Sequence, residues 1–216
     1  MNNFDQIQSI IKEYLADHGV ETEVLTSNLH AVSLDKQDSK YVYNGQRDLP
    51  VIDMDSIAQG GYKKAKNARD EAGENNIVNT ADGFLVDQDD NWTFVEFKNS
   101  EIKAKKDGLK NSILKKAYAN WYMLLDILYD MKQKGHVYPG FTYDQPMEFA
   151  QQHITFILVC SSEKNPRLYG KNKDCRLAGE RYVPGFMQRL KDYLFLDAYV
   201  YTEVELEQKF VRGFIG

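Results

Sequence analysis

The chain has 216 residues, of which 43% are hydrophobic and 12% aromatic, so it can bury a sizeable core in one domain and is not expected to be disordered. Its formal net charge of −5 excludes a protein that coats nucleic acid through overall positive charge, although a local basic groove stays open. The charge is uneven, because residues 1–90 hold 17 acidic and 8 basic side chains whereas residues 98–118 hold 7 lysines and 2 acids.

The first 55 residues are expected to form a helix, a strand and a polar loop or hairpin. Apolar residues at helical spacing predict a helix over residues 4–17, ended by His18 and Gly19. The alternating stretch VETEVLT, residues 20–26, predicts a strand, and the polar residues 35–50 predict loops or a hairpin. There is no signal-peptide pattern and no long apolar run, so we expect a cytoplasmic protein without a membrane segment.

Residues 56–73 are expected to form two short helices. Ser56 and Gln59, three residues apart, resemble a capping box, after which Gly60–Gly61 is expected to interrupt the helix. A second helix is predicted over residues 62–72, with Gly73 as its C-terminal cap.

The second half of the chain predicts alternating helices and strands. Its longest helix is predicted over residues 109–131, with an apolar spine at Leu109, Ile113, Ala117, Trp121, Leu124 or Leu125, and Leu128. The apolar run at residues 153–161 predicts a buried strand, and residues 170–185 form a polar, basic connection. A short helix over 186–194 and an alternating strand over 195–206 complete an α/β or α+β domain with a mixed sheet flanked by helices.

The stretch ADGFLVDQDDNWTFVEFKNS, residues 81–100, predicts a β-hairpin with charged ends. With a turn at residues 88–91, the numbers of opposite residues sum to about 178 or 179, which places Asp82 across from Glu96 or Phe97. Side chains alternate along a strand, so Glu96 and Lys98 share one face of the hairpin.

Two carboxylates and a lysine on one patch indicate a specific chemistry. Close carboxylates repel each other unless a cation or a proton intervenes. A hard cation such as Mg²⁺ binds to one or two carboxylates plus water, lowers the pKa of that water and stabilises charge on a phosphoryl group. Asp82, Glu96 and Lys98 therefore suggest metal-assisted phosphodiester hydrolysis, with Lys98 orienting the water.

The order Asp82, hairpin, Glu96-Phe97-Lys98 resembles the motif of the PD-(D/E)xK nuclease superfamily, which has a restriction-endonuclease-like fold. Ala81 stands at a position that varies in that family. The resemblance covers roughly residues 60–130 and implies that Asp82 and Glu96 bind Mg²⁺ (or Mn²⁺) together with the backbone carbonyl of Phe97. It also implies that Lys98 positions the attacking water.

Many members of that family carry a further acid on a preceding helix. Glu71 is our candidate for this catalytic acid, and Glu74 is the second choice. We expect a single domain over 1–216, with a nuclease-like core over about 56–160, a helical and hairpin elaboration over 1–55 and a C-terminal strand-helix-strand over 161–216.

The basic residues after the hairpin suggest the partner. A groove of lysines beside a metal site would follow a phosphate backbone, and the candidates for this nucleic-acid contact are Lys103, Lys106 and Lys110. A second basic segment could also reach over nucleic acid, although a solvated loop is favoured for its Lys171, Lys173, Arg176 and Arg181.

The expected function is a Mg²⁺-dependent endo- or exonuclease acting on DNA, or on RNA, with a homodimer left open. The alternative is a catalytically inactive nuclease-like fold that binds protein or nucleic acid.

Other acids and thiols have simpler interpretations. Asp53 and Asp55 could bind a metal, but a turn and a helix cap explain them better. Asp89 and Asp90 belong to the hairpin turn. The two cysteines lack CxxC spacing and are expected to be free thiols in a reducing compartment.

Overall fold

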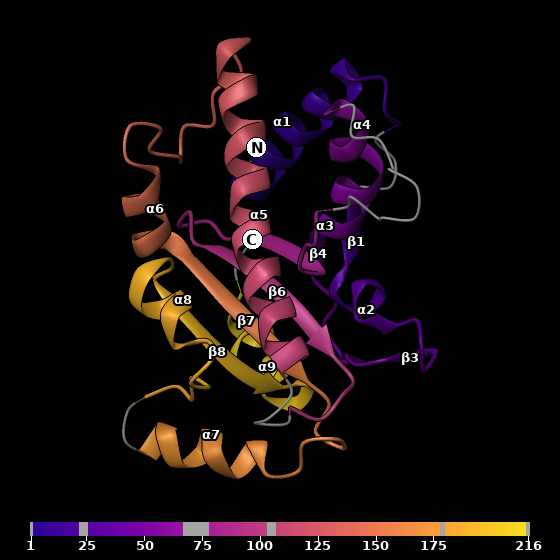
Figure 1. Ribbon diagram of the computed structural model, residues 1–216, viewed down its shortest axis with the longest axis vertical. Coiled ribbons are helices and arrows are strands. Elements are labelled where there is room, and N and C mark those ends of the chain that lie inside the picture. Colours follow the sequence, from indigo (N-terminus) through magenta and orange to yellow (C-terminus); the bar gives the residue numbers. More distant parts are fainter. Residues whose placement is uncertain (1, 22–25, 67–77, 103–106, 178–179, 215–216) are drawn as a thin grey trace.

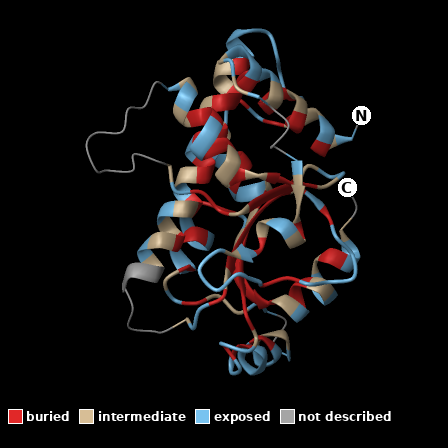
Figure 2. Cartoon of the chain, turned by 90° about the vertical axis from the view of Figure 1, so that its right-hand side faces the viewer, coloured by how far each residue is buried: buried red, intermediate tan, exposed pale blue. Residues whose placement is uncertain are grey.

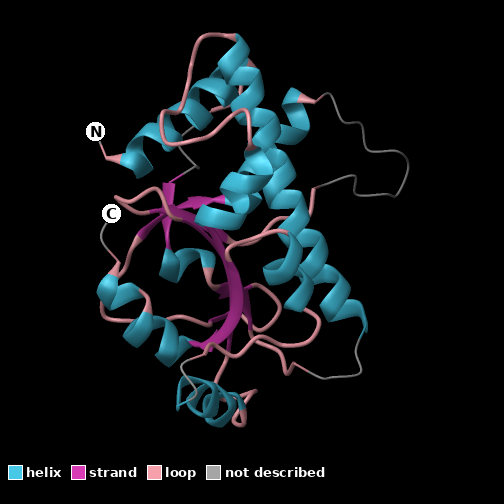
Figure 3. Cartoon of the chain, turned by 90° about the vertical axis from the view of Figure 1, so that its left-hand side faces the viewer, coloured by secondary structure: helices cyan, strands magenta, loops and turns pink. Residues whose placement is uncertain are grey.

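The computed structural model describes residues 2–21, 26–66, 78–102, 107–177 and 180–214, and it shows one twisted mixed sheet between two layers of helices (Figures 1 and 3). The sheet order is β1-β4-β5-β6-β7-β8, and the strands are β1 (Thr26–Asn28), β4 (Pro50–Asp53), β5 (Gly83–Val86), β6 (Trp92–Lys98), β7 (Ile154–Cys160) and β8 (Asp197–Thr202). The strands from β1 to β6 pair antiparallel, whereas β6, β7 and β8 are parallel. The predicted mixed sheet flanked by helices is confirmed.

Helices cover both faces of the sheet. The face that carries the longest helix is packed by α1 (Asn3–Asp17), α5 (Asp107–Gln133), α6 (Pro146–His153) and α8 (Gln188–Tyr193). The opposite face is covered by α2 (Leu29–Val32), α9 (Glu203–Lys209) and the 3₁₀ turn η3 (Val211–Gly213). The predicted helices over 4–17, 109–131 and 186–194 are confirmed. Within the described ranges, no helix combines the length and the apolar character that a membrane span requires.

The strands divide the core into two apolar clusters, one on each face, and Figure 2 shows the buried strands between them. Alternation along β6 places Trp92 and Phe94 in the cluster under α5, and Val95 and Phe97 in the cluster under α9. Because Glu96 continues the first series, its carboxylate points into the layer between the sheet and α5.

The segment after β4 differs from the prediction. Asp53, not Ser56, caps the helix, because the Asp53 carboxylate accepts the backbone N–H of Ser56 at 2.9 Å. The helix continues without a break from α3 (Met54–Ser56) through the π-helix η2 (Ile57–Tyr62) into α4 (Lys63–Ala65). Gly61 serves packing rather than interruption, since a Cβ there would lie 2.1 Å from a methyl carbon of Leu15 in α1. The rest of the helix predicted over 62–72 lies beyond Lys66, outside the described residues.

The other N-terminal predictions have mixed outcomes. Residues 22–25 of the predicted VETEVLT strand lie outside the described residues, and β1 begins at Thr26. The predicted polar hairpin is present as β2 (Leu34–Asp35) and β3 (Lys40–Tyr41), a small separate antiparallel pair.

The described part of the chain after β7 contains two α-helices that were not predicted, and α6 before β7 was not predicted either. The basic connection over 170–185 contains α7 (Leu168–Leu177), and the strand predicted over 195–206 ends at Thr202, where α9 begins. Residues 161–216 are thus two helices, a strand and a helix instead of a strand-helix-strand. Glu205 explains both differences. It closes a capping box with Thr202, and its buried carboxylate accepts hydrogen bonds from Asn172 and Arg176 of α7.

We therefore expect Thr202→Val to lower the free energy of unfolding by about 1 kcal/mol, because the backbone N–H of Glu205 loses its acceptor while the side-chain volume is kept. Urea denaturation measures the change. Thr155→Val in β7 is the matched control, since a β-branched apolar residue suits a strand and should leave the stability unchanged or raised. Equal losses in both variants would contradict a role for the cap.

Candidate functional site

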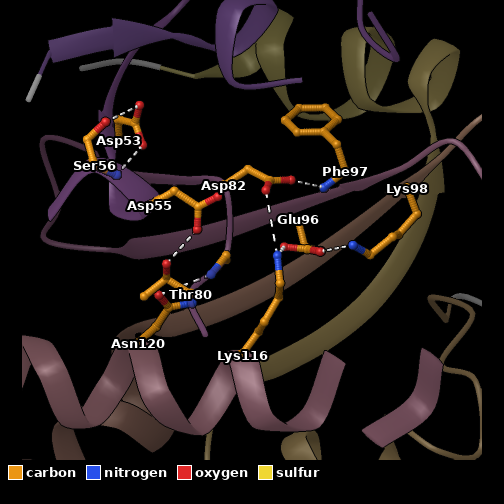
Figure 4. Close-up of polar contacts among 11 residues, drawn as sticks. Asp53, Asp55, Ser56, Thr80, Asp82, Glu96, Phe97, Lys98, Lys116 and Asn120 are labelled. Atoms are coloured by element: carbon orange, nitrogen blue, oxygen red, sulfur yellow. Dashed lines mark hydrogen bonds and ion pairs between the residues drawn. The ribbon is translucent and has the colours of Figure 1, made fainter. Parts of the chain in front are cut away.

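The candidate site begins at the open end of the β5–β6 hairpin (Figure 4). Gly83 pairs with Val95 and Phe84 with Phe94, so the numbers of the paired residues sum to 178. Of the two registers that the sequence left open, this one is confirmed. Asp82 lies one residue before the first paired residue of β5, and its N–H donates to the Val95 carbonyl at 3.1 Å, so it adjoins the Val95–Phe97 edge without forming a regular pair with Glu96.

Asp82 is held along the edge of β6. Its Oδ2 accepts the backbone N–H of Phe97 at 2.6 Å, and its side chain is 17% exposed. In a β-strand the N–H and C=O of one residue point to the same side. The carbonyl of Phe97 is therefore directed to the side on which the Asp82 carboxylate lies.

Glu96 is a fully buried carboxylate with two lysines as its cations. Its Oε1 lies 2.5 Å from Lys98 Nζ and its Oε2 accepts a hydrogen bond from Lys116 Nζ at 2.9 Å. A buried ionised carboxylate is tolerated only where it is paired, so these two contacts are what allow Glu96 to occupy the apolar layer under α5.

Lys116 joins the two carboxylates and was not among the predicted site residues. Its Nζ also lies 3.7 Å from Asp82 Oδ1, so a single ammonium group bridges Asp82 and Glu96. Figure 4 shows Lys116 extending from α5 toward both carboxylates. The sequence contained a signal that Lys116 faces the sheet. It lies three residues after Ile113 and four before Asn120, so it shares a helix face with these two buried residues.

Asn120 and Asp55 fix the chain just before Asp82. The Asn120 side chain accepts the N–H of Ala81 at 3.2 Å, and the Thr80 hydroxyl donates to Asp55 Oδ1 at 2.7 Å. Asn120 is fully buried and one turn beyond Lys116, so one face of α5 both positions Asp82 and supplies its cation.

A cavity of about 170 Å³ borders the site on the β4 side, and its lining includes Asp53, Asp55 and Asp82. Asp53 caps α3, which agrees with the turn-and-cap interpretation of this acid although the capping box expected at Ser56 is not formed, and Asp55 holds Thr80. Among the residues that the structure describes, no group of three or more His, Cys, Asp or Glu side chains has the geometry to hold a metal ion. Any metal here would rest on Asp82 and Glu96, with backbone carbonyl and water oxygens as further ligands.

The structure brings together Asp82, Glu96, Phe97 and Lys98 from the predicted set. Glu71, Glu74, Lys103 and Lys106 lie outside the described residues.

The remaining predicted basic residues separate into two kinds. Lys110 lies near the start of α5 and lines a pocket beyond the carboxylates. In the second basic segment, Arg176 and Arg181 form ion pairs with Glu205 and Asp197 and are therefore structural.

The hairpin turn contains the other acids. The Asp87 carboxylate accepts the backbone N–H groups of Asp89 and Asn91, both at 2.9 Å. Asp90 has a positive φ of 58° and accepts a hydrogen bond from the Tyr138 hydroxyl. These contacts agree with the prediction of turn chemistry for Asp89 and Asp90.

The electrostatics of the site are dominated by burial. Burial raises the pKa of Asp82 well above its ordinary value and the charge of Glu96 raises it further, against the opposing effects of Lys116, the Phe97 N–H and Lys98. For Lys116, burial acts to lower the pKa, but the charges of Glu96 and Asp82 outweigh it and the pKa is raised. Lys116 is thus stabilised as a cation, whereas the environment of Asp82 favours its protonated form more than solvent does, and added positive charge would oppose that shift.

No protein-family model, no curated protein and no solved structure matches this chain.

The raised pKa of Asp82 predicts a pH-dependent stability in metal-free buffer. A carboxyl group whose pKa is raised by folding stabilises the protein below the ordinary pKa near 4, and this contribution is lost as pH rises through the raised value. We therefore expect the wild type to lose stability relative to Asp82→Asn as pH rises above about 4 in EDTA.

Urea denaturation between about pH 4 and 8 measures this difference. Asp144→Asn, at an exposed loop position, controls for the loss of one carboxylate. A difference that is constant with pH, or that shifts in favour of the wild type, would contradict the assignment.

Proposed function

We propose that this protein is a divalent-metal-dependent nuclease of the PD-(D/E)xK type that hydrolyses phosphodiester bonds in DNA, or in RNA. The observation that carries the proposal is the meeting of Asp82 and Glu96 around one cationic group, with Lys98 on Glu96. Two carboxylates, a strand carbonyl and a lysine at such spacing are the groups that the motif requires. The free state of Cys160 and Cys175 supports a reducing compartment, and we propose the cytoplasm.

The residues present fit a hard divalent cation. All the donors are oxygens, which Mg²⁺ and Mn²⁺ prefer, and the bridging ammonium of Lys116 marks where positive charge is stabilised between the carboxylates. Asp82, Glu96 and the Phe97 carbonyl would hold the ion. When bound, it would polarise the phosphodiester and lower the pKa of a bound water.

The chain's own groups account for the rest of the reaction. Lys98 is 24% exposed and ends β6, so its ammonium group can reach from Glu96 toward solvent and orient the attacking water. The water oxygen bonds to phosphorus and gives up one proton to solvent, while the bond from phosphorus to one ester oxygen breaks and that leaving oxygen takes up one proton from solvent, so that one water is consumed. Lys116 offsets the negative charge that builds up beside Asp82 and Glu96 as the reaction proceeds.

The second candidate is a non-catalytic module with the same fold that binds nucleic acid or protein. One observation favours it, namely that Lys98 and Lys116 already place two ammonium groups beside the two carboxylates, so the site contains positive charge without a metal. In such a module the lysines would act as a permanent substitute for the ion. Metal binding and cleavage decide between the two candidates.

Lys98→Ala should reduce the rate of metal-dependent cleavage about 100-fold or more, because the attacking water loses its orienting group. The measurement is single-turnover cleavage of labelled single-stranded DNA, duplex DNA and single-stranded RNA with MgCl₂ or MnCl₂. Glu96→Gln keeps the side-chain shape and should be equally inactive. Lys134→Ala, an exposed lysine paired with Asp17 at the far end of α5, is the matched control. No cleavage of any substrate by the wild type would leave the binding module as the function.

The variant Lys116→Met should distinguish stabilisation of the two carboxylates by a metal ion from their stabilisation by the Lys116 ammonium group. In EDTA this variant leaves two buried carboxylates without their bridging cation, which should lower stability by about 3 kcal/mol. Mg²⁺ or Mn²⁺ should then raise its Tm more than that of the wild type, because the ion no longer competes with the ammonium group.

Thermal unfolding with EDTA, MgCl₂ and MnCl₂ tests this expectation. Lys115→Met, at the adjacent exposed position of α5, is the control for the substitution itself. If neither ion changes the Tm of wild type or variant, a metal role for Asp82 and Glu96 is wrong.

A further inference from the structure

A pocket of about 750 Å³ lies where β6 and β7 end, between the start of α5 and α7. Its walls combine cationic, aromatic and apolar side chains, and the members that matter here are Lys110, Lys164, Arg167, Lys171, Tyr182 and Phe186. The carboxylate site described above uses none of these six residues.

The pocket is strongly cationic in a protein of net negative charge. Four lysine or arginine side chains line it, and Glu101 is the one acid among the described residues of its lining. Lys110, Lys164 and Arg167 form no ion pair with any residue that the structure describes. Their charge is therefore directed to the pocket and the solvent, where it would attract an anion.

Two aromatic rings form an apolar wall beside these cations. Tyr182 and Phe186 are half-buried and pack against the main core cluster, so the core supports their rings from behind. Lys171 Nζ lies 5.4 Å from the centre of the Tyr182 ring. Cations next to supported rings are the combination with which proteins hold an unpaired strand, because phosphates contact the cations and bases stack on the rings.

A buried asparagine fixes the pocket relative to the carboxylate site. Asn165 accepts the N–H of Ile102 and donates to the carbonyls of Ser100 and Ser161, both at 3.0 Å. Ser161 in turn donates its N–H to the Lys98 carbonyl at 3.1 Å. Glu101, the first residue of the pocket lining, follows Lys98 by only three residues, so the Cα atoms of Lys98 and Glu101 are no more than about 11 Å apart. The pocket therefore lies close enough to Lys98 for one bound nucleic-acid strand to reach both.

We infer that this pocket binds a single-stranded segment of nucleic acid, with its phosphates on Lys164, Arg167 and neighbouring cations and a base against Phe186 or Tyr182. This inference rests on the proposed nuclease function, because it specifies the substrate class of that nuclease as unpaired strands or single-stranded ends. A duplex does not satisfy the aromatic wall, because its bases are stacked inside the helix and cannot reach the rings.

The test is a fluorescence-anisotropy titration of labelled single-stranded DNA, single-stranded RNA and the matching DNA duplex, in EDTA so that cleavage does not interfere. The double variant Lys164→Ala/Arg167→Ala should weaken single-strand binding about tenfold or more, and it should lower the slope of log K against log salt by about 1.4 for the two lost phosphate contacts. Phe186→Leu should weaken binding about tenfold without changing that slope, because stacking is lost while the charges stay.

Lys209→Ala, an exposed lysine on α9, is the matched control and should bind like the wild type. Circular-dichroism melting checks that each variant is folded. A preference for single strands over duplex that the pocket variants abolish supports the inference, and the DNA and RNA arms then identify the natural strand. Equal binding of duplex and single strand, or pocket variants with wild-type affinity, would overturn it.

These outcomes are separate from those of the nuclease proposal. Single-strand binding at the pocket without cleavage under any metal condition would support the pocket and remove the nuclease function. Metal-dependent cleavage that is insensitive to the pocket variants would support the nuclease function and contradict the role of the pocket.

Discussion

The burial of the Glu96 carboxylate is the constraint on which the site depends. A charged group with no exposed surface in the layer between sheet and helix is stable only if cations reach it, and the chain supplies them from two directions. Lys98 comes from the same strand, two residues further on, and Lys116 comes from the helix above. Loss of either contact would leave charge in a layer that is otherwise apolar, so the position of α5 over β6 is tied to this pairing.

The topology explains why α5 provides the second cation. β6 and β7 are parallel, and the chain must cross over the sheet between them, which places α5 on the face to which Glu96 points. The same crossover brings Asn120 over Ala81, at the entry to β5. One helix face thus holds both carboxylates through the charge of Lys116, and it also holds the chain before Asp82 through the N–H of Ala81. The geometry of the pair is a property of how the helix packs on the sheet as much as of the hairpin.

The contrast between the local hairpin and the long-range packing of α5 explains which parts of the site could be predicted from sequence. The approach of Asp82 to Glu96 depends on local register arithmetic and strand alternation, and both can be counted along the chain. Lys116 depends on which stripe of a long helix faces the sheet. The apolar spine is borne out by Ile113, Ala117 and Trp121, which are buried, but it does not show which polar neighbour turns inward.

α7 was missed for a related reason. It has little apolar surface of its own and is held to α9, at the end of β8, through the buried carboxylate of Glu205, a contact between residues far apart in sequence.

The two cavities near the hairpin have opposite electrostatic character, and this difference would determine from which side a charged ligand approaches the site. The smaller one, toward β4, contains Asp53, Asp55 and Asp82, whereas the larger one, at the ends of β6 and β7, contains Lys110, Lys164 and Arg167. Lys98 is the last residue of β6, three residues before Glu101 in the lining of the larger cavity. A polyanion would be repelled from the acidic side and attracted to the basic side, so it would approach the carboxylates from the α7 end of the sheet.

A cation would be drawn the opposite way, toward the acids. The overall negative charge of the chain is then compatible with nucleic-acid binding, because the acids of the smaller cavity and the cations of the larger one line different parts of the molecule.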